Sequence, residues 1–304
     1  MPTSADLRGV IPAIPTPFSA DGRDIDEGAL RRIVRHVVAG GVHGIMTTGG
    51  TGEFPHLSRQ ERRRVNEVVA SEVAGTVPIY AGTAACSTWE AIELMEDAAA
   101  VGADAAILTP PFYFAIPDSM LHAHFDDVAK AGVLPVVVYN NPLYTGNDLS
   151  PQLIASLMAL DNVIGLKQSD SDLGALVEAL RLSAGTGRSL CTGIDSQFYA
   201  ALCVGARGIF STAAAIVPSQ MVRLYELVEA GDHDGARAQH ELLQPLNRFL
   251  EYDPGYVSPT KEALEMMGIG CGPVRRPLPD FPDAERPALR DALAALGALE
   301  AALA

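Results

Sequence analysis

The chain has 304 residues, of which 48% are apolar and 19% charged, and this composition excludes a disordered or strongly solvated protein. Its 22 Lys and Arg residues stand against 37 Asp and Glu residues, and the resulting net charge of −15 argues against binding to nucleic acid or to anionic lipid. We therefore expect a folded protein of enzyme size that binds neither nucleic acid nor a membrane.

Several further features predict a cytoplasmic protein. The first 18 residues lack a basic start followed by a long apolar stretch, and no window approaches the roughly 20 continuous apolar residues of a membrane span. No C-x-x-C pair occurs, so we expect the cysteines to be buried thiols in a reducing compartment. These cysteines are Cys86, Cys191, Cys203 and Cys271.

Short apolar runs alternate with amphipathic segments over about the first 230 residues, taken in chain order. The runs predicted to be strands lie at 10–14, 44–47, 78–82, 105–108, 135–139, 163–167, 189–192 and 208–210. The segments predicted to be helices lie at 26–39, 58–73, 87–101, 119–131, 150–160, 172–183, 195–204 and 219–230. Helix start signals support this pattern, such as Ser58 followed by Glu61 and Ser87 followed by Glu90. Each predicted strand is followed by one helix.

Eight such units predict a (β/α)8 barrel, or TIM barrel, because a doubly wound sheet rarely uses so many equal units. Strand signals stop after residue 231, and helices are expected at 232–250, 260–267 and 284–303. We therefore divide the chain into a barrel, 8–231, and a C-terminal helical region, 232–304, packed on the barrel or on a neighbouring subunit. Barrel enzymes carry their chemistry at the C-terminal ends of the strands, so the candidate residues are sought there.

The second strand runs into a glycine-rich loop that contains Gly49, Gly50 and Thr51. Glycines let backbone N–H groups approach a bound anion, and the Thr hydroxyls add donors, so the loop could hold a carboxylate or a phosphate. A tight turn that needs positive φ explains the glycines equally well. The spacing differs from that of a nucleotide-binding P-loop, which is thereby excluded.

Lys167 ends the sixth predicted strand and is expected to point into the barrel mouth. Partial desolvation there disfavours the charged form of the amine, which could then attack a ketone and form a Schiff base. The alternative is a rim lysine paired with a carboxylate such as that of Asp170. Tyr139 ends the fifth strand and could move protons near the imine, although a tyrosine at a strand end is often an aromatic plug.

The histidines show no H-x-x-x-H or H-E-x-x-H spacing, and no metal ion is expected. Trp89 and the methionines are predicted to lie in the core.

Three ordered motifs, GGTGE at 49–53, YNNPLYTG at 139–146 and GLKQSD at 165–170, resemble the family of dihydrodipicolinate synthase and N-acetylneuraminate lyase. The resemblance implies a (β/α)8 barrel with a C-terminal helical region, usually tetrameric, that acts through a lysine Schiff base without a metal or organic cofactor. By position, Lys167 matches the Schiff-base lysine and Tyr139 the tyrosine that shuttles protons. Thr51 and neighbouring amides match the clamp on the carboxylate of a 2-oxo acid.

The sequence departs from the family pattern in ways that bear on the substrate. Gly50 stands where the family has Ser or Thr, so one hydroxyl of the family's proton relay is missing. The tyrosine that dihydrodipicolinate synthases take from a neighbouring subunit falls at Phe112, with Tyr113 one place later. Their arginine for the incoming carboxylate falls at Tyr144, and the GEFPHLS and PPFYF segments look more like the 4-hydroxy-2-oxo acid and sugar-acid aldolases.

We therefore predict a class I lyase that forms an imine with a pyruvate-type 2-oxo acid and reversibly cleaves a 4-hydroxy-2-oxo acid or a 2-dehydro-3-deoxy sugar acid. The alternatives are 4-hydroxy-tetrahydrodipicolinate synthase, which joins pyruvate to aspartate semialdehyde, a sugar-acid dehydratase, and a non-catalytic 2-oxo acid sensor. A homotetramer is expected. The catalytic residues are predicted to be Lys167 and Tyr139, and the substrate-binding residues Gly49, Gly50, Thr51, Tyr113, Tyr144, Gly193, Asp195 and Ser211. Asp195 could instead cap the helix that follows it.

Overall fold

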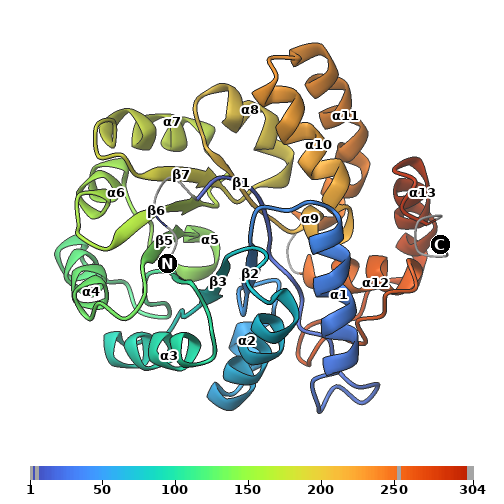
Figure 1. The fold of residues 1–304 in the computed structure, drawn as a ribbon, viewed down its shortest axis with the longest axis horizontal. Helices are drawn as coiled ribbons and strands as arrows, with labels where there is room; N and C mark the ends of the chain where they lie inside the picture. Colours follow the sequence, from blue (N-terminus) through green and yellow to red (C-terminus); the bar gives the residue numbers. More distant parts are fainter. Residues whose placement is uncertain (1–2, 4–6, 252–254, 300–304) are drawn as a thin grey trace.

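The computed structural model describes residue 3, residues 7–251 and residues 255–299, and its centre is a parallel barrel ringed by helices (Figure 1). The strands of the sheet are β1 (Gly9–Pro12), β2 (Ile45–Thr47), β3 (Ile79–Gly82), β4 (Ala105–Leu108), β5 (Val136–Asn140), β6 (Val163–Gln168), β7 (Ser189–Thr192) and β8 (Gly208–Ser211). Their order is β1-β8-β7-β6-β5-β4-β3-β2, and a parallel bridge between Ala13 and Met46 joins the two ends. The predicted (β/α)8 barrel is confirmed.

The outer ring consists of helices that follow the strands along the chain. These are α1 (Glu27–Ala39), α2 (Arg59–Val73), α3 (Thr88–Ala100), α4 (Asp118–Lys130), α6 (Pro151–Met158), α7 (Leu173–Leu182), α8 (Phe198–Cys203) and α10 (Pro218–Glu229). The predicted start signals operate as expected: Ser58 and Glu61 exchange hydrogen bonds in a capping box, and the Ser87 hydroxyl accepts from the Glu90 N–H.

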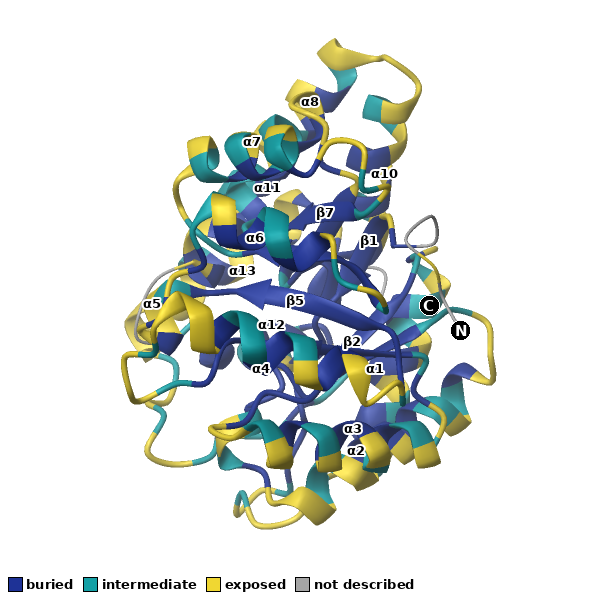
Figure 2. Cartoon of the chain, turned by 90° about the vertical axis from the view of Figure 1, so that its left-hand side faces the viewer, coloured by how far each residue is buried: buried dark blue, intermediate teal, exposed yellow. Residues whose placement is uncertain are grey.

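Every strand is buried on both faces, which explains its continuous apolar sequence (Figure 2). Alternate residues point into the barrel and out toward the helices. In β4, for example, Ala105 and Ile107 belong to the interior cluster, whereas Ala106 and Leu108 pack with the helices. The same alternation places Tyr139 of β5 inside the barrel.

The prediction of one helix after each strand is wrong after β2, β5, β7 and β8. Short elements intervene there: η1 (Phe54–His56), α5 (Pro142–Thr145), η2 (Asp195–Gln197) and α9 (Ala213–Ile216). Elements of three or four residues are too short to show a helical period, so the sequence pattern did not reveal them. The predicted helix 195–204 is accordingly divided into η2 and α8.

The C-terminal region contains α11 (His233–Leu250), α12 (Val257–Met266), η3 (Asp283–Glu285) and α13 (Arg286–Ala295). Helix α12 therefore begins before the predicted 260–267, and α13 ends before 303, a residue that lies outside the described part. Helix α11 contacts α10, and α12 contacts α9, so this region packs on the barrel. The division of the chain between residues 231 and 232 stays a prediction.

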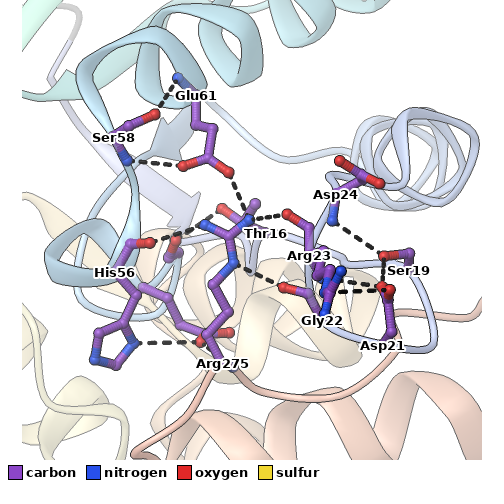
Figure 3. A network of polar contacts seen from close by, with 12 residues as sticks. Thr16, Ser19, Asp21, Gly22, Arg23, Asp24, His56, Ser58, Glu61 and Arg275 are labelled. Atoms are coloured by element: carbon purple, nitrogen blue, oxygen red, sulfur yellow. Dashed lines mark hydrogen bonds and ion pairs between the residues drawn. The ribbon is translucent and has the colours of Figure 1, made fainter.

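Arg275 fastens the C-terminal region to the first part of the chain (Figure 3). Its guanidinium donates to the backbone carbonyls of Gly22, Arg23 and His56 at 3.0, 2.6 and 2.8 Å, and it lies 2.5 Å from the Glu61 carboxylate. Four acceptors around one planar cation fix its geometry. The contacts tie the segment after α12 to the start of α2.

Some burial predictions are wrong. Cys86 and Cys203 are exposed, while Cys191 and Cys271 are buried, and all four are free thiols. Trp89 is 80% exposed because it lies in the first turn of α3 on the side away from the sheet. No described helix combines the length and the apolar character that a membrane span requires.

Candidate active site

Lys167 lies inside the barrel near the C-terminal end of β6. It is 5% exposed, and β5 places Tyr139 opposite it in register. Its Nζ lies 4.0 Å from the centroid of the Tyr139 ring and 3.8 Å from the Met46 Sδ atom. Among the described residues no carboxylate forms an ion pair with it, and Asp170 accepts a backbone N–H of its own loop instead. The structure therefore does not show the rim ion pair with Asp170.

The Tyr139 phenol is 8% exposed, and its oxygen accepts a hydrogen bond of 2.8 Å from the Asn141 side chain. Burial by itself raises the pKa of this phenol. The positive charge of Lys167 and hydrogen bonds from neighbouring side chains lower it by more, so the pKa of Tyr139 lies below its ordinary value of 10.0. A phenol of this kind can exchange a proton with a group bound at Lys167 more readily than an ordinary tyrosine.

Both side chains open into a cavity of about 100 Å³. The other residues that line it are Gly50, Thr51, Asn141, Leu143, Tyr144, Ser169, Gly193, Ile194, Asp195, Thr212, Leu250, Glu251 and Tyr256. The predicted residues Gly50, Thr51, Tyr144, Gly193 and Asp195 are thus brought together with Lys167 and Tyr139. Gly49, Tyr113 and Ser211 are not among the lining residues.

The glycine-rich loop contributes differently at each position. At Gly49 a Cβ atom would come within 2.5 Å of the Met46 Cε atom, so this glycine lets the loop pack closely on the barrel interior. Thr51 is 3% exposed, and its hydroxyl lies 3.2 Å from that of Thr212. Glu53 ends the loop in a left-handed conformation with φ 57°. The left-handed positions around this loop are thus Thr48 and Glu53, while Gly49, Gly50 and Gly52 lie outside that region, so the explanation of the glycines by a turn with positive φ is wrong.

Gly193, after β7, provides room for the lysine. A Cβ atom there would lie 2.7 Å from the Lys167 Cε atom and 2.0 Å from the Ser169 Oγ atom. No other residue fits without moving these side chains.

Asp195 and Ser211 are engaged with each other. The Ser211 hydroxyl donates to one Asp195 oxygen at 2.5 Å, and the other oxygen accepts the N–H groups of Thr212 and Ala213 at 3.1 and 3.2 Å. Asp195 thus binds the start of α9, an element that follows a different strand, and not the helix directly after it. Burial raises the pKa of this carboxyl to about 6, the Ser211 hydroxyl opposes the rise, and nearby Glu251 adds to it.

Two predicted contacts lie toward solvent. Tyr113 is 87% exposed with φ 83°, a conformation that is strained for a tyrosine, and it does not line the cavity that holds Lys167. Phe112, one residue earlier, packs edge-on against Phe54 with ring centroids 6.0 Å apart. Tyr144 is 51% exposed and stands at the mouth.

A second, larger and mainly apolar cavity of about 340 Å³ adjoins the first. The two share the residues Gly50, Tyr139, Asn141, Tyr144 and Tyr256. The walls of the second cavity are completed by Glu53, Phe54, Pro55, His56, Thr109, Phe112, Thr145, Val257 and Leu278. Lys167 is the one Lys or Arg among the described residues that line either cavity, and the walls also include the acidic residues Glu53, Asp195 and Glu251.

Sequence reasoning missed two residues that complete the site. Tyr256 lines both cavities from just before α12, and no motif marks it. Lys261 lies in α12, is 2% exposed, and forms a 2.5 Å ion pair with Glu53 at the end of the glycine-rich loop. Neither could be linked to the loop from sequence, because both are more than 200 residues away in the chain. Across the described residues no group of three or more His, Cys, Asp or Glu side chains could hold a metal ion.

Residues 6–296 match the model of the dihydrodipicolinate synthetase family. The chain belongs to this family. A curated relative, 4-hydroxy-tetrahydrodipicolinate synthase of Methanopyrus kandleri, is 38% identical over 296 residues, covering 96% of this chain and 97% of the relative. The chain is a class I lyase of the family.

Two solved structures show how closely the fold agrees. A structure described as the first monomeric dihydrodipicolinate synthase variant has a TM-score of 0.92 and 30% identity, covering 97% of this chain and 99% of that one. The family member YagE from E. coli K12, solved in complex with pyruvate, has a TM-score of 0.91 and 28% identity, covering 96% of this chain and 99% of that one.

Proposed function

We propose that Lys167 forms an imine with the C2 carbonyl of pyruvate or a related 2-oxo acid. The Nζ atom attacks the carbonyl carbon, and both amine hydrogens leave with the carbonyl oxygen as water. The observation that supports this role most directly is a buried lysine that pairs with no carboxylate of the described residues and lies against the ring of Tyr139, in a cavity at the C-terminal end of the strands. The pyruvate complex of the similar structure from E. coli supports the choice of ligand.

The imine then serves as an electron sink for cleavage of a 4-hydroxy-2-oxo acid or a 2-dehydro-3-deoxy sugar acid. The Tyr139 phenol first gives its proton to the imine nitrogen, and the phenolate then takes the proton of the C4 hydroxyl. The C3–C4 bond breaks, its electron pair passes to the protonated imine to give a neutral enamine on Lys167, and the aldehyde leaves. Protonation of the enamine carbon and addition of water return pyruvate and the free amine. The backbone amides of the loop at 49–51 and the Thr51 hydroxyl are suited to hold the carboxylate.

Trapping with borohydride tests this proposal directly. The sequence has three lysines, Lys130, Lys167 and Lys261, so an adduct is easily located. We expect pyruvate and borohydride to add one reduced pyruvyl group to Lys167, read by the mass of its peptide. The Lys167→Ala variant should gain nothing, and Lys130→Ala, which changes an exposed lysine paired with Asp126, should react normally. An adduct on another lysine, or none with any 2-oxo acid, would overturn the mechanism.

A second candidate, 4-hydroxy-tetrahydrodipicolinate synthase, is favoured by the name of the Methanopyrus relative. It shares the imine with pyruvate but requires aspartate semialdehyde, which brings a carboxylate of its own. The described walls of both cavities hold no Arg, so the first proposal agrees better with the site. Comparing kcat/KM for the semialdehyde with that for a neutral hydroxyaldehyde separates the two, and product analysis separates both from a dehydratase, which breaks a carbon–oxygen bond.

Assembly as a homotetramer and a cytoplasmic location stay predictions. Tyr113 and Phe114 expose 87% and 70% of their surface side by side, which supports burial against another copy. The similar monomeric variant shows that this fold does not by itself fix the oligomeric state. Light scattering at micromolar concentration measures it, and a stable monomer would refute the prediction.

A further inference from the structure

The Tyr256 hydroxyl occupies the space in which a side chain at position 50 would lie. A Cβ atom built on Gly50 would stand 2.4 Å from the Tyr256 Oη atom but 3.8 Å from its Cζ atom. The backbone at Gly50 lies outside the left-handed region, so the turn itself does not require glycine. The absence of a side chain at position 50 is therefore explained by Tyr256, whose hydroxyl occupies the space that the side chain would fill.

The tyrosine ring is held by its surroundings. Tyr256 immediately precedes α12, and one turn later Lys261 is joined to Glu53 of the same glycine-rich loop at 2.5 Å. The ring centroid lies 6.1 Å from that of Tyr144. The ion pair of Lys261 with Glu53 and the ring contact with Tyr144 thus hold Tyr256 in place. Its hydroxyl lies at the wall of both cavities, next to Gly50 and Thr51.

The two inner tyrosines differ in their readiness to lose a proton. Burial raises the pKa of Tyr256 well above its ordinary value, the nearby phenols of Tyr139 and Tyr144 raise it further, and the Thr51 side chain opposes the rise. The pKa of Tyr139 is lowered instead. Tyr256 therefore keeps its proton under conditions in which Tyr139 can exchange one, and it can act as a neutral donor.

The carboxylate of a 2-oxo acid needs such donors, because Lys167 is the one Lys or Arg among the described walls and its amine is engaged in the imine. We propose that Tyr256 is a substrate-binding residue whose hydroxyl donates a hydrogen bond to this carboxylate, in place of the side-chain hydroxyl that the loop lacks at position 50. The inference rests on the proposed imine at Lys167 and names a further residue of that site. The proton stays on Tyr256, and no bond is formed or broken there.

The test compares pyruvate with methyl pyruvate, which keeps the ketone but has no carboxylate charge. The quantity measured is the ligand concentration that gives half the maximal rate of borohydride trapping. In Tyr256→Phe we expect this concentration to rise about tenfold or more for pyruvate, the usual effect of losing a hydrogen bond to a charged group, and to stay within about twofold for methyl pyruvate. Tyr199→Phe, a change on α8 where the hydroxyl contacts His233, is the matched control and should alter neither value.

A rescue experiment separates the hydroxyl from simple filling of space. In the Tyr256→Phe background, Gly50→Ser places its Cβ atom at ordinary contact distance from the ring and puts a hydroxyl into the vacated volume. It should recover most of the affinity for pyruvate, whereas Gly50→Ala in the same background should not. Should Tyr256→Phe fail to fold, Gly50→Ala alone displaces the tyrosine hydroxyl without supplying another, and it should weaken the trapping of pyruvate selectively.

Three results would overturn the inference: an equal loss for both ketones, recovery by Gly50→Ala as complete as by Gly50→Ser, or unchanged concentration dependence for pyruvate in Tyr256→Phe. Absence of trapping in the unaltered protein would instead refute the imine at Lys167, so the two failures are distinguishable.

Discussion

Two lysines are buried in this molecule, and they differ in what surrounds the ammonium group. Lys261 in α12 lies 2.5 Å from a Glu53 oxygen and 2.8 Å from the carbonyl of Pro273. Lys167 in β6 has the thioether of Met46 and the face of the Tyr139 ring as neighbours, and no carboxylate in the described part of the chain. Both are at most 5% exposed.

The two lysines are buried alike and differ in their partners, so the partners are the basis on which we propose a structural role for Lys261 and a reactive role for Lys167. A buried ammonium without a counter-charge is costly, so selection for stability alone does not explain Lys167. Lys261 compensates the charge of Glu53 and joins the C-terminal region to the glycine-rich loop. The region around α12 therefore stabilises the site, while the end of β6 carries the lysine that we propose to be reactive.

Exchanging each lysine for methionine, which has a similar length and no charge, tests this comparison most strongly. Lys261→Met leaves Glu53 buried without its partner, and we expect it to lower the free energy of unfolding by about 3–5 kcal/mol. Lys167→Met should leave that free energy unchanged or raise it, while turnover disappears. Urea unfolding of both variants measures the effect.

Lys261→Met combined with Glu53→Gln provides the control, because removing both charges should recover part of the lost stability. If Lys167→Met is destabilised as much as Lys261→Met, the distinction between the two lysines is wrong.

The sequence revealed Lys167 and not Lys261 for a physical reason. A lysine that interrupts an apolar run at a strand end is a local pattern, and its neighbour Tyr139 is found by the same rule on the preceding strand. The pair of Lys261 with Glu53 joins residues far apart in the chain, and it depends on how α12 packs. Tyr256 was missed for the same reason, because the fit of its hydroxyl against Gly50 exists only in three dimensions.

The fold was accessible because its strands are buried on both faces and stand out as apolar runs, and because caps such as Ser58 mark helix starts. The short elements that shape the mouth, α5 and α9 among them, left no periodic signal. Tyr113 shows a related limit, since the sequence placed it near the substrate while the backbone turns its side chain outward.

Tyr139→Phe tests whether the phenol hydroxyl moves protons at the imine that we propose on Lys167. The phenol oxygen is the nearest candidate to move protons once the imine forms, so its removal should lower kcat by roughly 10²-fold or more, while borohydride trapping on Lys167 persists. The measurements are steady-state turnover and the mass of the trapped adduct on one preparation. Near-normal turnover would return Tyr139 to the role of an aromatic plug.

Asp195 extends the comparison to a buried carboxyl that pairs with no cation of the described residues. Its pKa in the folded protein is raised to about 6 from an ordinary 3.8, so the folded state favours the protonated form. The stability that this group contributes is present at acid pH and is lost as pH rises through about 6.

The Asp195→Asn variant lacks this titration. We expect the difference in unfolding free energy, wild type minus variant, to fall by about 2 kcal/mol between about pH 4.5 and about pH 7.5. The amide of this variant can form weaker hydrogen bonds than the carboxyl, but this changes the free-energy difference by the same amount at every pH. The test is therefore the change of the difference with pH. A difference that rises with pH would show that Asp195 has a compensating cation in solution.

The smallest effect is expected from adding a second cation at the mouth. Tyr144 stands half exposed at the edge of both cavities, where an arginine could reach the carboxylate of aspartate semialdehyde. Solvent screens a pair at such a site, so we expect Tyr144→Arg to raise kcat/KM for the semialdehyde only about tenfold, and to leave that for a neutral aldehyde unchanged. Tyr144→Gln, which removes the phenol without adding charge, is the control.

The result bears on which acceptor the unaltered site prefers. Arg207 is another basic residue whose charge would suit this carboxylate. It directly precedes β8 and therefore lies at the opposite end of the barrel from Lys167, near the C-terminal end of β6. With Lys167 engaged in the imine, the described walls then offer the semialdehyde carboxylate no cation. If the unaltered protein nevertheless prefers the semialdehyde, or if the arginine variant gains nothing with it, a cation from outside these walls must bind that carboxylate. The synthase assignment should then replace the aldolase.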